Sequence, residues 1–296
     1  MDDRGVVLTE ELIKDLLEKV STLYGNALKK AVRKLARFFR LWEEREKMAP
    51  PEYISEAGEE FERRWRESTL TQLVDEEHVP ETVSHELGVA GLAASALIFA
   101  AMPRVAKINR DYTVAVAEEV ARKYGRRIQL PHKTLEELRV LYDSEVPPFS
   151  RMAYTRMGQD KQAMERMQRE MHQAIVRREL LKDILKRLMR VTDMEYSAAR
   201  RVAQTEGNRV MSEARYQACE EAAANGIIYI NEWSARMVNT RESHAALNRT
   251  TRRQGETWVT IWGNELRFPG DPMAPAREVI NCHCVLLPCK SVEGVD

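Results

Sequence analysis

Apolar side chains recur every three or four positions over residues 9–47, and this period constrains the fold more than any other feature of the sequence. The set consists of Leu12, Leu16, Val20, Leu23, Ala27, Ala31, Leu35, Phe38 and Trp42. A helix with one packed face has this period. Pro50 and Pro51 follow, and proline lacks the amide donor that a continuing helix needs. The sequence therefore predicts one long helix that starts at Thr9 and ends before these prolines.

More helical segments are predicted as far as residue 224. They are a charge-rich stretch at 55–73, an apolar run at 88–102, a segment at about 108–124, an apolar stripe at 164–188 and a helix at about 194–224. Pro80 is expected to break the chain before the apolar run. Gly125 and the pair Asn225 and Gly226 are expected to end helices, because these residues accept the left-handed backbone of a C-cap. Residues 130–133 and 146–149 contain prolines and are expected to be turns or linkers.

The amino-acid composition of the chain changes after Gly226. Residues 227–230, 258–262, 266–268 and 285–287 are rich in β-branched, aromatic and other apolar residues, and Gly263 and Asn264 indicate a turn between two of these runs. We therefore expect an α+β protein, mainly α-helical in its N-terminal region, followed by a small mixed α/β C-terminal lobe with a few short strands. The predicted domains are 1–149, which is helical, and 150–296, with long helices at 151–224 and the lobe at 225–290.

Charge and hydropathy exclude some classes of protein. The 46 basic and 46 acidic residues give a formal net charge of zero, so no global field attracts nucleic acid. The start of the chain lacks the continuous apolar block of a secretory signal. We therefore expect a protein that is not secreted and whose thiols stay reduced. The apolar run at 88–102 is shorter than the roughly 20 residues that span a bilayer, so we expect a buried helix and no stable membrane insertion.

A basic stripe lies along the second half of the first helix. It consists of Lys29, Lys30, Arg33, Lys34, Arg37 and Arg40. Most charged helix faces are simply solvated, and that interpretation applies here. The alternative is a contact with the phosphates of double-stranded DNA or with an acidic partner, since any such contact in a neutral chain must come from a local patch.

Sulfur and imidazole ligands are concentrated near the C-terminus. Cys282 and Cys284 are separated by one residue, and in an extended segment both would face the same way while His283 would face the opposite way. Thiolate and imidazole together suit zinc. His244 is the better third ligand, and Cys289 or Asp271 could supply a fourth. The sequence thus indicates a possible zinc site at His244, Cys282 and Cys284.

Three other interpretations of these residues remain open. The cysteines can be small buried hydrophobes, with His244 hydrogen-bonded to a carbonyl group. They can form a disulfide, although a reducing compartment disfavours one. In the third interpretation, Cys282 or Cys284 is a nucleophile activated by His244, but no oxyanion loop or nucleophile elbow accompanies them.

The C-terminal third also carries an ordered set of motifs. They are Trp233; Thr240-Arg241-Glu242-Ser243-His244-Ala245-Ala246-Leu247-Asn248; Phe268-Pro269-Gly270-Asp271-Pro272; Ala274-Pro275; and Glu278-Val279-Ile280-Asn281-Cys282-His283-Cys284. This string resembles the C-terminal domain of phage head-morphogenesis proteins, the Mu F-like minor capsid family. Upstream, Ala203-Gln204-Thr205-Glu206 is similar to the family's Arg-Thr-Glu helix, with glutamine in place of arginine. Other departures are Met237 and Asn239 for Asp and Arg, Arg249 for Gly, and His283 for the Arg between the cysteines.

The resemblance implies a low-copy minor protein of the virion. Such a protein joins the procapsid through the portal, lies inside the head near it, and affects packaging or ejection of DNA. The implied partners are the portal protein and the major capsid or scaffolding protein, with the host cytoplasm as the place of assembly. Helix 9–47 would supply the docking surface. No catalytic motif is recognised in the helical region, so we expect no enzyme. The alternative is a DNA-binding protein ejected with the genome.

Overall fold

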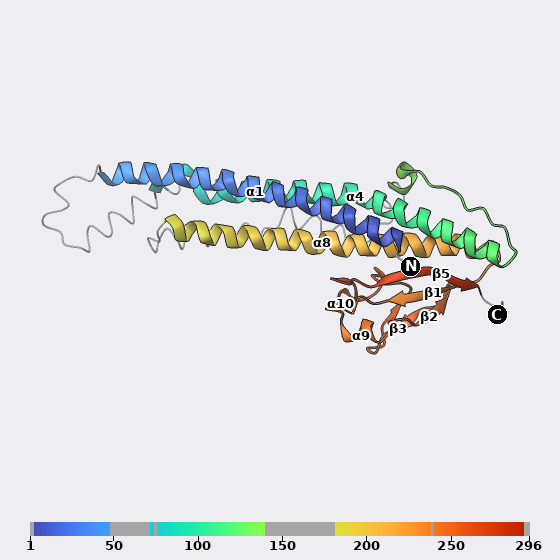
Figure 1. Cartoon of the computed structure of the whole chain (residues 1–296). Helices are drawn as coiled ribbons and strands as arrows, with labels where there is room; N and C mark the ends of the chain where they lie inside the picture. Colours follow the sequence, from blue (N-terminus) through green and yellow to red (C-terminus); the bar gives the residue numbers. More distant parts are fainter. Residues whose placement is uncertain (1–2, 48–71, 74–75, 140–180, 238, 293–296) are drawn as a thin grey trace. The chain divides into compact units, whose positions relative to one another are not determined.

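The computed structural model describes residues 3–47, 72–73, 76–139, 181–237 and 239–292 (Figure 1). Three long helices, α1 (Arg4–Lys47), α4 (Val79–Lys123) and α8 (Leu181–Ala223), precede a small lobe of short strands in this part of the chain. The strands are β1 (Tyr229–Ser234), β2 (Thr251–Arg253), β3 (Trp258–Val259), β4 (Glu265–Leu266) and β5 (Val285–Val292). The predicted α+β class, with helices first and a lobe of a few strands after them, is confirmed.

Helix α1 begins five residues before the predicted start at Thr9. The carboxylate of Asp3 accepts a hydrogen bond of 3.1 Å from the backbone N–H of Val6, and so satisfies a donor that has no partner within the helix. The hydroxyl of Thr9 donates instead to the carbonyl oxygen of Gly5, 2.7 Å away and one turn earlier. The prediction that Thr9 starts the helix was wrong, because Asp3 is the cap.

Helix α4 joins two segments that the sequence analysis treated separately. Pro80 lies in its first turn, where a missing N–H costs nothing, and Pro103 lies inside the helix without ending it. At the other end, the N–H of Gly125 bonds to the carbonyl of Arg122 and the N–H of Arg126 to that of Ala121. This pair of bonds, with Gly125 at φ 73°, forms a Schellman cap. The predicted stop at Gly125 is confirmed.

Helix α8 ends where the sequence predicted. Gly226 has φ 77° and its N–H bonds to the carbonyl of Ala223 at 2.9 Å. Residues 164–180 of the predicted stripe, the turn at 146–149 and nearly all of the predicted helix at 55–73 lie outside the described residues. The proposed domain boundary at 149/150 lies there too and stays a prediction.

The chain divides into two compact units, each assembled from separate segments: residues 1–18, 97–153 and 200–296, and residues 19–96 and 154–199. The second unit consists, in its described part, of stretches of α1, α4 and α8. Its buried side chains include Val20, Leu35 and Phe38 of α1 and Ala90 of α4. Hence most of the apolar period over residues 9–47 is used for packing within the chain.

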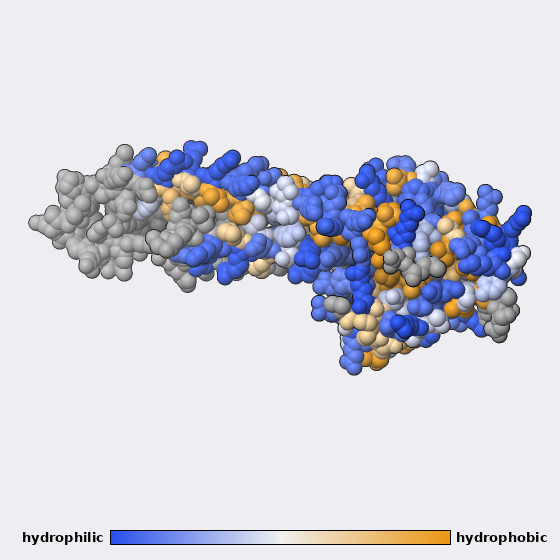
Figure 2. Space-filling model, viewed as in Figure 1, coloured by the Kyte–Doolittle hydropathy of each residue, from blue (hydrophilic) through white to orange (hydrophobic). Residues whose placement is uncertain are grey.

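The apolar stretch of α4 is only partly buried. By length and composition alone, residues 85–123 could cross a bilayer, a test that core helices of soluble proteins also pass, and 39% of the most apolar window is buried. Ala94 and Ile98 are buried, whereas Val89 and Leu92 are 47% and 50% exposed. On the face drawn in Figure 2, hydrophobic residues alternate with hydrophilic ones along the helices. The predicted burial of 88–102 holds for one face, and the absence of membrane insertion stays a prediction.

The lobe in the first unit contains a sheet of order β2-β1-β5, antiparallel throughout, and a separate β3-β4 hairpin. Strand β1 alternates buried and half-buried side chains, as expected for a sheet with one covered face. Alanines of α4 and α8 pack against Tyr229 and Cys289 of the sheet. The predicted turn at Gly263 is confirmed, since its N–H bonds to the carbonyl of Thr260 at 2.9 Å. Strand β2 was not predicted.

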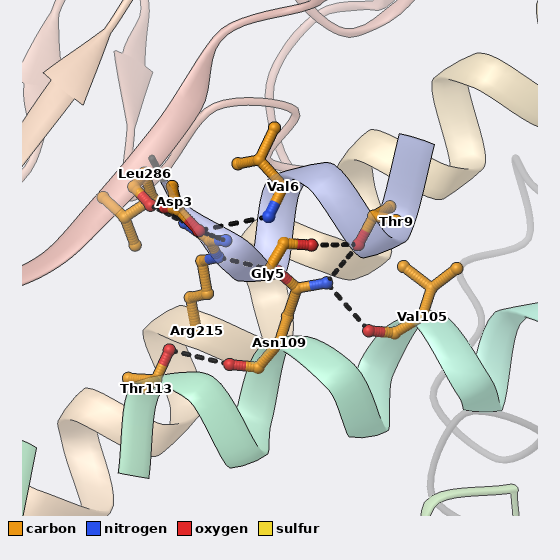
Figure 3. A network of polar contacts seen from close by, with 9 residues as sticks. All are labelled: Asp3, Gly5, Val6, Thr9, Val105, Asn109, Thr113, Arg215 and Leu286. Carbon is orange, nitrogen blue, oxygen red and sulfur yellow. Dashed lines mark hydrogen bonds and ion pairs between the residues drawn. The ribbon is translucent and has the colours of Figure 1, made fainter. Parts of the chain in front are cut away.

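A buried polar network joins α1, α4, α8 and β5 (Figure 3). Arg215 of α8, which is 0% exposed, donates to both carboxylate oxygens of Asp3 at 2.6 and 2.9 Å, to Oδ1 of Asn109 at 2.9 Å and to the carbonyl of Leu286 at 2.9 Å. Asn109 also donates to Thr9 at 2.7 Å. One guanidinium group therefore connects the start of α1 with α4 and β5 within the first unit.

Candidate functional site

The candidate site combines one residue from a short helix with two from the segment that precedes β5. His244 lies in α9 (Glu242–Ala245), and Cys282 and Cys284 follow α10 (Ala276–Val279). Between α10 and the cysteines the chain reverses at Asn281, which has φ 55°, a left-handed value that Asn tolerates better than most residues. Residues 282–284, which have no regular secondary structure, then lead into β5. This geometry places both sulfurs on the side of His244.

The three predicted ligands converge. Nδ1 of His244 lies 3.5 Å from Sγ of Cys282 and 3.5 Å from Sγ of Cys284, and their ligand atoms all lie within 4.8 Å of one another. All three side chains are 1–2% exposed. Among the described residues, this is the group of His, Cys, Asp and Glu side chains whose spacing suits a metal ion.

Glu278 is the partner that sequence reasoning missed. Its Oε2 lies 3.0 Å from Nε2 of His244, on the far side of the imidazole ring from the sulfurs. Nε2 makes no well-aligned hydrogen bond with any described residue and is fully buried. The side chain of Glu278 is 0% exposed. The sequence offered one indication, because Glu278 stands four positions before Cys282 within the recognised string and a ligating histidine usually has a carboxyl neighbour.

Three side chains hold Glu278 in place. Ser243 donates to Oε2 at 3.1 Å, while Thr260 and Asn264 donate to Oε1 at 3.3 and 2.7 Å. The last two residues belong to the β3-β4 hairpin. Hence the hairpin fixes the carboxyl group, and the carboxyl group faces the histidine.

Aromatic rings enclose the sulfur side of the site. The Trp233 ring meets the His244 ring edge-on, with centroids 5.2 Å apart, and the Trp258 ring at 5.6 Å. Trp233 and Trp258 are buried in the same apolar cluster as Cys282 and Cys284. This apolar surrounding excludes water and strengthens electrostatic interactions inside it.

The two thiols share their protons unequally. Hydrogen bonds from Cys284 and then His244 hold the pKa of Cys282 well below its usual range in spite of burial. The hydrogen bond with Cys282, together with burial, raises the pKa of Cys284. The pair therefore favours one thiolate, which is the form that binds a metal ion.

Helix α8 supports the segment that carries the cysteines. Asn208 donates to the carbonyl of Cys284 at 3.0 Å, and the hydroxyl of Thr205 accepts the N–H of Asn281 at 3.2 Å. Glu206, the next residue in the predicted Thr-Glu motif, is buried and paired with Arg209 at 3.0 Å. The upstream motif thus positions the downstream one.

Neither suggested fourth ligand joins the group. Asp271 accepts hydrogen bonds from the backbone and side chain of Arg267, at 2.7–2.9 Å, and from the backbone of Met273 at 3.0 Å. Burial alone would raise the pKa of Asp271, but these hydrogen bonds lower it below its usual value. The Sγ of Cys289 lies 3.3 Å from that of Cys219 in a different apolar cluster. The prediction of Asp271 or Cys289 as a fourth ligand was wrong. Asp271 accepts the hydrogen bonds of a turn, and Cys289 is packed in a separate apolar cluster.

The remaining alternatives can be weighed against this geometry. The four cysteines are free thiols, so the structure contains no disulfide among them. Cys282 and Cys284 are almost sealed from solvent, whereas a nucleophilic thiolate needs access to its substrate. His283 is half-buried, lies outside the ligand group, and has its pKa lowered by burial. The arrangement therefore fits binding or packing better than nucleophilic catalysis.

One departure from the family pattern has a backbone explanation. Arg249, which stands where the family has glycine, has φ 61°, and its N–H bonds to the carbonyl of Trp233 at 2.7 Å. Glycine adopts this left-handed conformation without steric cost. The position thus requires the backbone that glycine provides, and this chain achieves it with arginine.

The basic stripe lies on α1, in the second compact unit. Lys30 and Lys34 lie 3.6 and 2.8 Å from the carboxylate of Glu86, and the hydrogen bond from Lys34 lowers the pKa of that group. The other members of the stripe, Lys29, Arg33, Arg37 and Arg40, are exposed. The structure thus divides the predicted stripe into a paired edge and an exposed row.

Comparison with known protein families matches residues 165–287 to the family described as Phage Mu protein F like protein. This match confirms the resemblance seen in the motifs. No curated protein and no solved structure gave a significant match. The C-terminal region is thus Mu F-like, which indicates a role in phage head morphogenesis and an association with the virion.

Proposed function

We propose that this chain, whose residues 165–287 are Mu F-like, is a minor head protein that joins the procapsid through the portal and remains inside the head. The match to the family carries the proposal. The family is one of structural head proteins, which supports a non-enzymatic role. Packaging or ejection of DNA would follow from a position near the portal.

The arrangement of the motifs supports the use of the family match. Residues far apart in the sequence, such as Thr205, Trp233, His244 and Cys284, lie in or against one buried cluster. A chance resemblance of short motifs would not require them to meet. The described part of the match from residue 200 onward therefore belongs to one compact unit, which supports applying the family's role to this chain.

We propose a docking surface other than the one expected from the sequence. Leu16, Leu35 and Phe38, which were the expected apolar anchors of the first helix, are buried within the chain. Several exposed apolar side chains lie on the lobe: Val259, Ile261, Trp262, Met273 and Ile280 are 43–82% exposed. Where exposed apolar side chains form a contiguous patch, they mark an interaction site. We assign contact with the portal to this side of the β3-β4 hairpin and α10.

Particle composition tests the proposal. Procapsids assembled with the portal, capsid and scaffolding proteins of the same phage are expected to contain a few copies of the chain, and particles lacking the portal none, as counted by quantitative mass spectrometry. Ile261→Asp should reduce incorporation, because it places a charge in an apolar contact. Ile228→Asp is the matched control, since Ile228 is 47% exposed but lies outside the hairpin. Equal incorporation with and without the portal would contradict the proposal.

The exposed row of Lys29, Arg33, Arg37 and Arg40 favours DNA contact as a second candidate function. Binding through phosphates releases counterions, so the affinity should fall steeply with salt, by a slope of about 0.9 per phosphate contact. Replacing all four with alanine is expected to reduce the slope by about 3 to 4. Lys34→Ala is the control, because Lys34 is paired with Glu86 at 2.8 Å. Failure of a filter to retain DNA even at about 50 mM salt would exclude this function.

A further inference from the structure

We propose that His244, Cys282 and Cys284 bind one zinc ion, through Nδ1 of the histidine and the two sulfurs. The three side chains come from α9 and from the segment that precedes β5, and they would supply three of the ion's coordination positions. The inference depends on the geometry of these residues and not on a role in the phage head. A negative result for zinc binding would therefore leave the proposed function unaffected, and the reverse also holds.

Interatomic distances carry the first step. Zinc bonds of about 2.0–2.1 Å to nitrogen and about 2.3 Å to sulfur, at a tetrahedral angle, separate N and S by roughly 3.6 Å. The two observed separations between Nδ1 and the sulfurs are both 3.5 Å. Two sulfurs bound to one zinc ion lie roughly 3.8 Å apart. This expected separation is within the 4.8 Å limit observed for the ligand atoms. One ion can thus reach all three atoms without a large rearrangement.

The second step is the valence of Nδ1. A neutral imidazole nitrogen has one lone pair and accepts one hydrogen bond in its preferred direction. Here two sulfurs lie at the same distance from this one atom. Hydrogen bonding alone leaves one of these contacts poorly satisfied, whereas an ion between the three atoms satisfies them all.

The third step is the opposite edge of the ring. Zinc-bound histidines usually donate their other N–H to a carboxyl group, which fixes the ring and its tautomer. Nε2 is buried, has no aligned partner among the described residues, and lies 3.0 Å from Oε2 of Glu278. A metal ion at Nδ1 would leave the proton on Nε2, the nitrogen beside this carboxyl group. Glu278 is thus a positioning residue, and the hairpin donors Thr260 and Asn264 hold it.

The chemical role follows from burial. With ligands 1–2% exposed, the ion would be enclosed by Trp233 and Trp258 and would join α9 to the segment that precedes β5. A structural site of this kind contributes its binding free energy to folding. We assign the ion a structural role in holding the Mu F-like lobe together.

Metal analysis of the full chain tests the proposal. Protein produced in zinc-supplemented medium should contain about one zinc per chain, and Cys282→Ser or Cys284→Ser should reduce this below about 0.2. Cys219→Ala and Cys289→Ala are matched controls, because these cysteines are also buried free thiols but lie outside the group. Less than about 0.2 zinc in the unaltered protein, or equal loss in the controls, would overturn the site.

Cobalt substitution keeps the test decisive if a serine variant fails to fold. Unaltered protein stripped of metal and loaded with Co²⁺ should show the strong visible bands of a tetrahedral site and a thiolate-to-cobalt charge-transfer band. Glu278→Gln should keep these bands but weaken the affinity about 10- to 100-fold in competition with a chelator. Weak octahedral bands without charge transfer, or an unchanged affinity in Glu278→Gln, would overturn the ligand set or the role of Glu278 respectively.

Discussion

Replacing Arg215 with methionine is expected to lower the free energy of unfolding by about 3 to 5 kcal/mol, because it breaks a buried ion pair and leaves its partners unsatisfied. The guanidinium group donates to Asp3, Asn109 and the carbonyl of Leu286, and none of these has a substitute donor in methionine. Methionine is unbranched and fills irregular space, so the loss reflects the polar contacts more than a cavity. Urea denaturation followed by circular dichroism measures it as a shift in midpoint.

Arg236→Met is the matched control for this prediction. Arg236 also forms an ion pair with a residue of α1, Glu10, but both side chains are about half exposed. Exposed ion pairs contribute about 0.2 to 1 kcal/mol, so this variant should lose less than about 1 kcal/mol. If Arg215→Met costs no more than Arg236→Met, the buried network does not stabilise the first unit in the way described.

Features that depend on neighbouring residues could be predicted from the sequence. The stops at Gly125 and Gly226 and the turn at Gly263 follow from local backbone preferences, and all three occur as expected. The start of α1 was misplaced because two acceptable caps, Asp3 and Thr9, lie near each other. Local preference alone does not choose between them.

Features that depend on residues distant in the sequence could not be predicted from it. Arg215 looks like any charged residue of a helix, and its burial results from contacts with Asp3 and Leu286, 212 and 71 positions away. Pro103 lies inside α4, which continues through it although proline removes a helix hydrogen bond. Periodicity therefore located the helices but could not show where tertiary packing overrides it.

The candidate site also has features that the sequence predicted and features that it did not. Residue chemistry was enough to expect that His244, Cys282 and Cys284 meet, and the structure brings them together. It did not identify Glu278, whose burial depends on donors from the β3-β4 hairpin. It suggested Asp271 as a ligand because a carboxylate suits zinc, although the role of Asp271 is to hold Arg267 and the turn beside it.

Gly270→Ala is the second change with a large expected effect, a loss of about 2 to 5 kcal/mol in the free energy of unfolding. The N–H of Asp271 bonds to the carbonyl of Phe268 at 3.1 Å, with Pro269 and Gly270 between them and Gly270 at φ 80°. This is a type II turn, which favours glycine at its third position. A left-handed backbone costs alanine about 1–2 kcal/mol, and overpacking costs a further 1–3 kcal/mol, roughly. Denaturation of the full chain measures the total.

Overpacking arises because the added Cβ would lie 3.3 Å from Cα of Arg209 in α8, an atom that cannot move without moving the helix. Gly263→Ala separates the two contributions, since Gly263 has a similar φ of 77° but nothing within 4 Å of the added atom. It should lose only about 1–2 kcal/mol. Equal losses would mean that the Pro-Gly-Asp turn needs glycine for its backbone alone. A larger loss at Gly270 would mean that close packing of this turn on α8 stabilises the lobe that carries the His244 site.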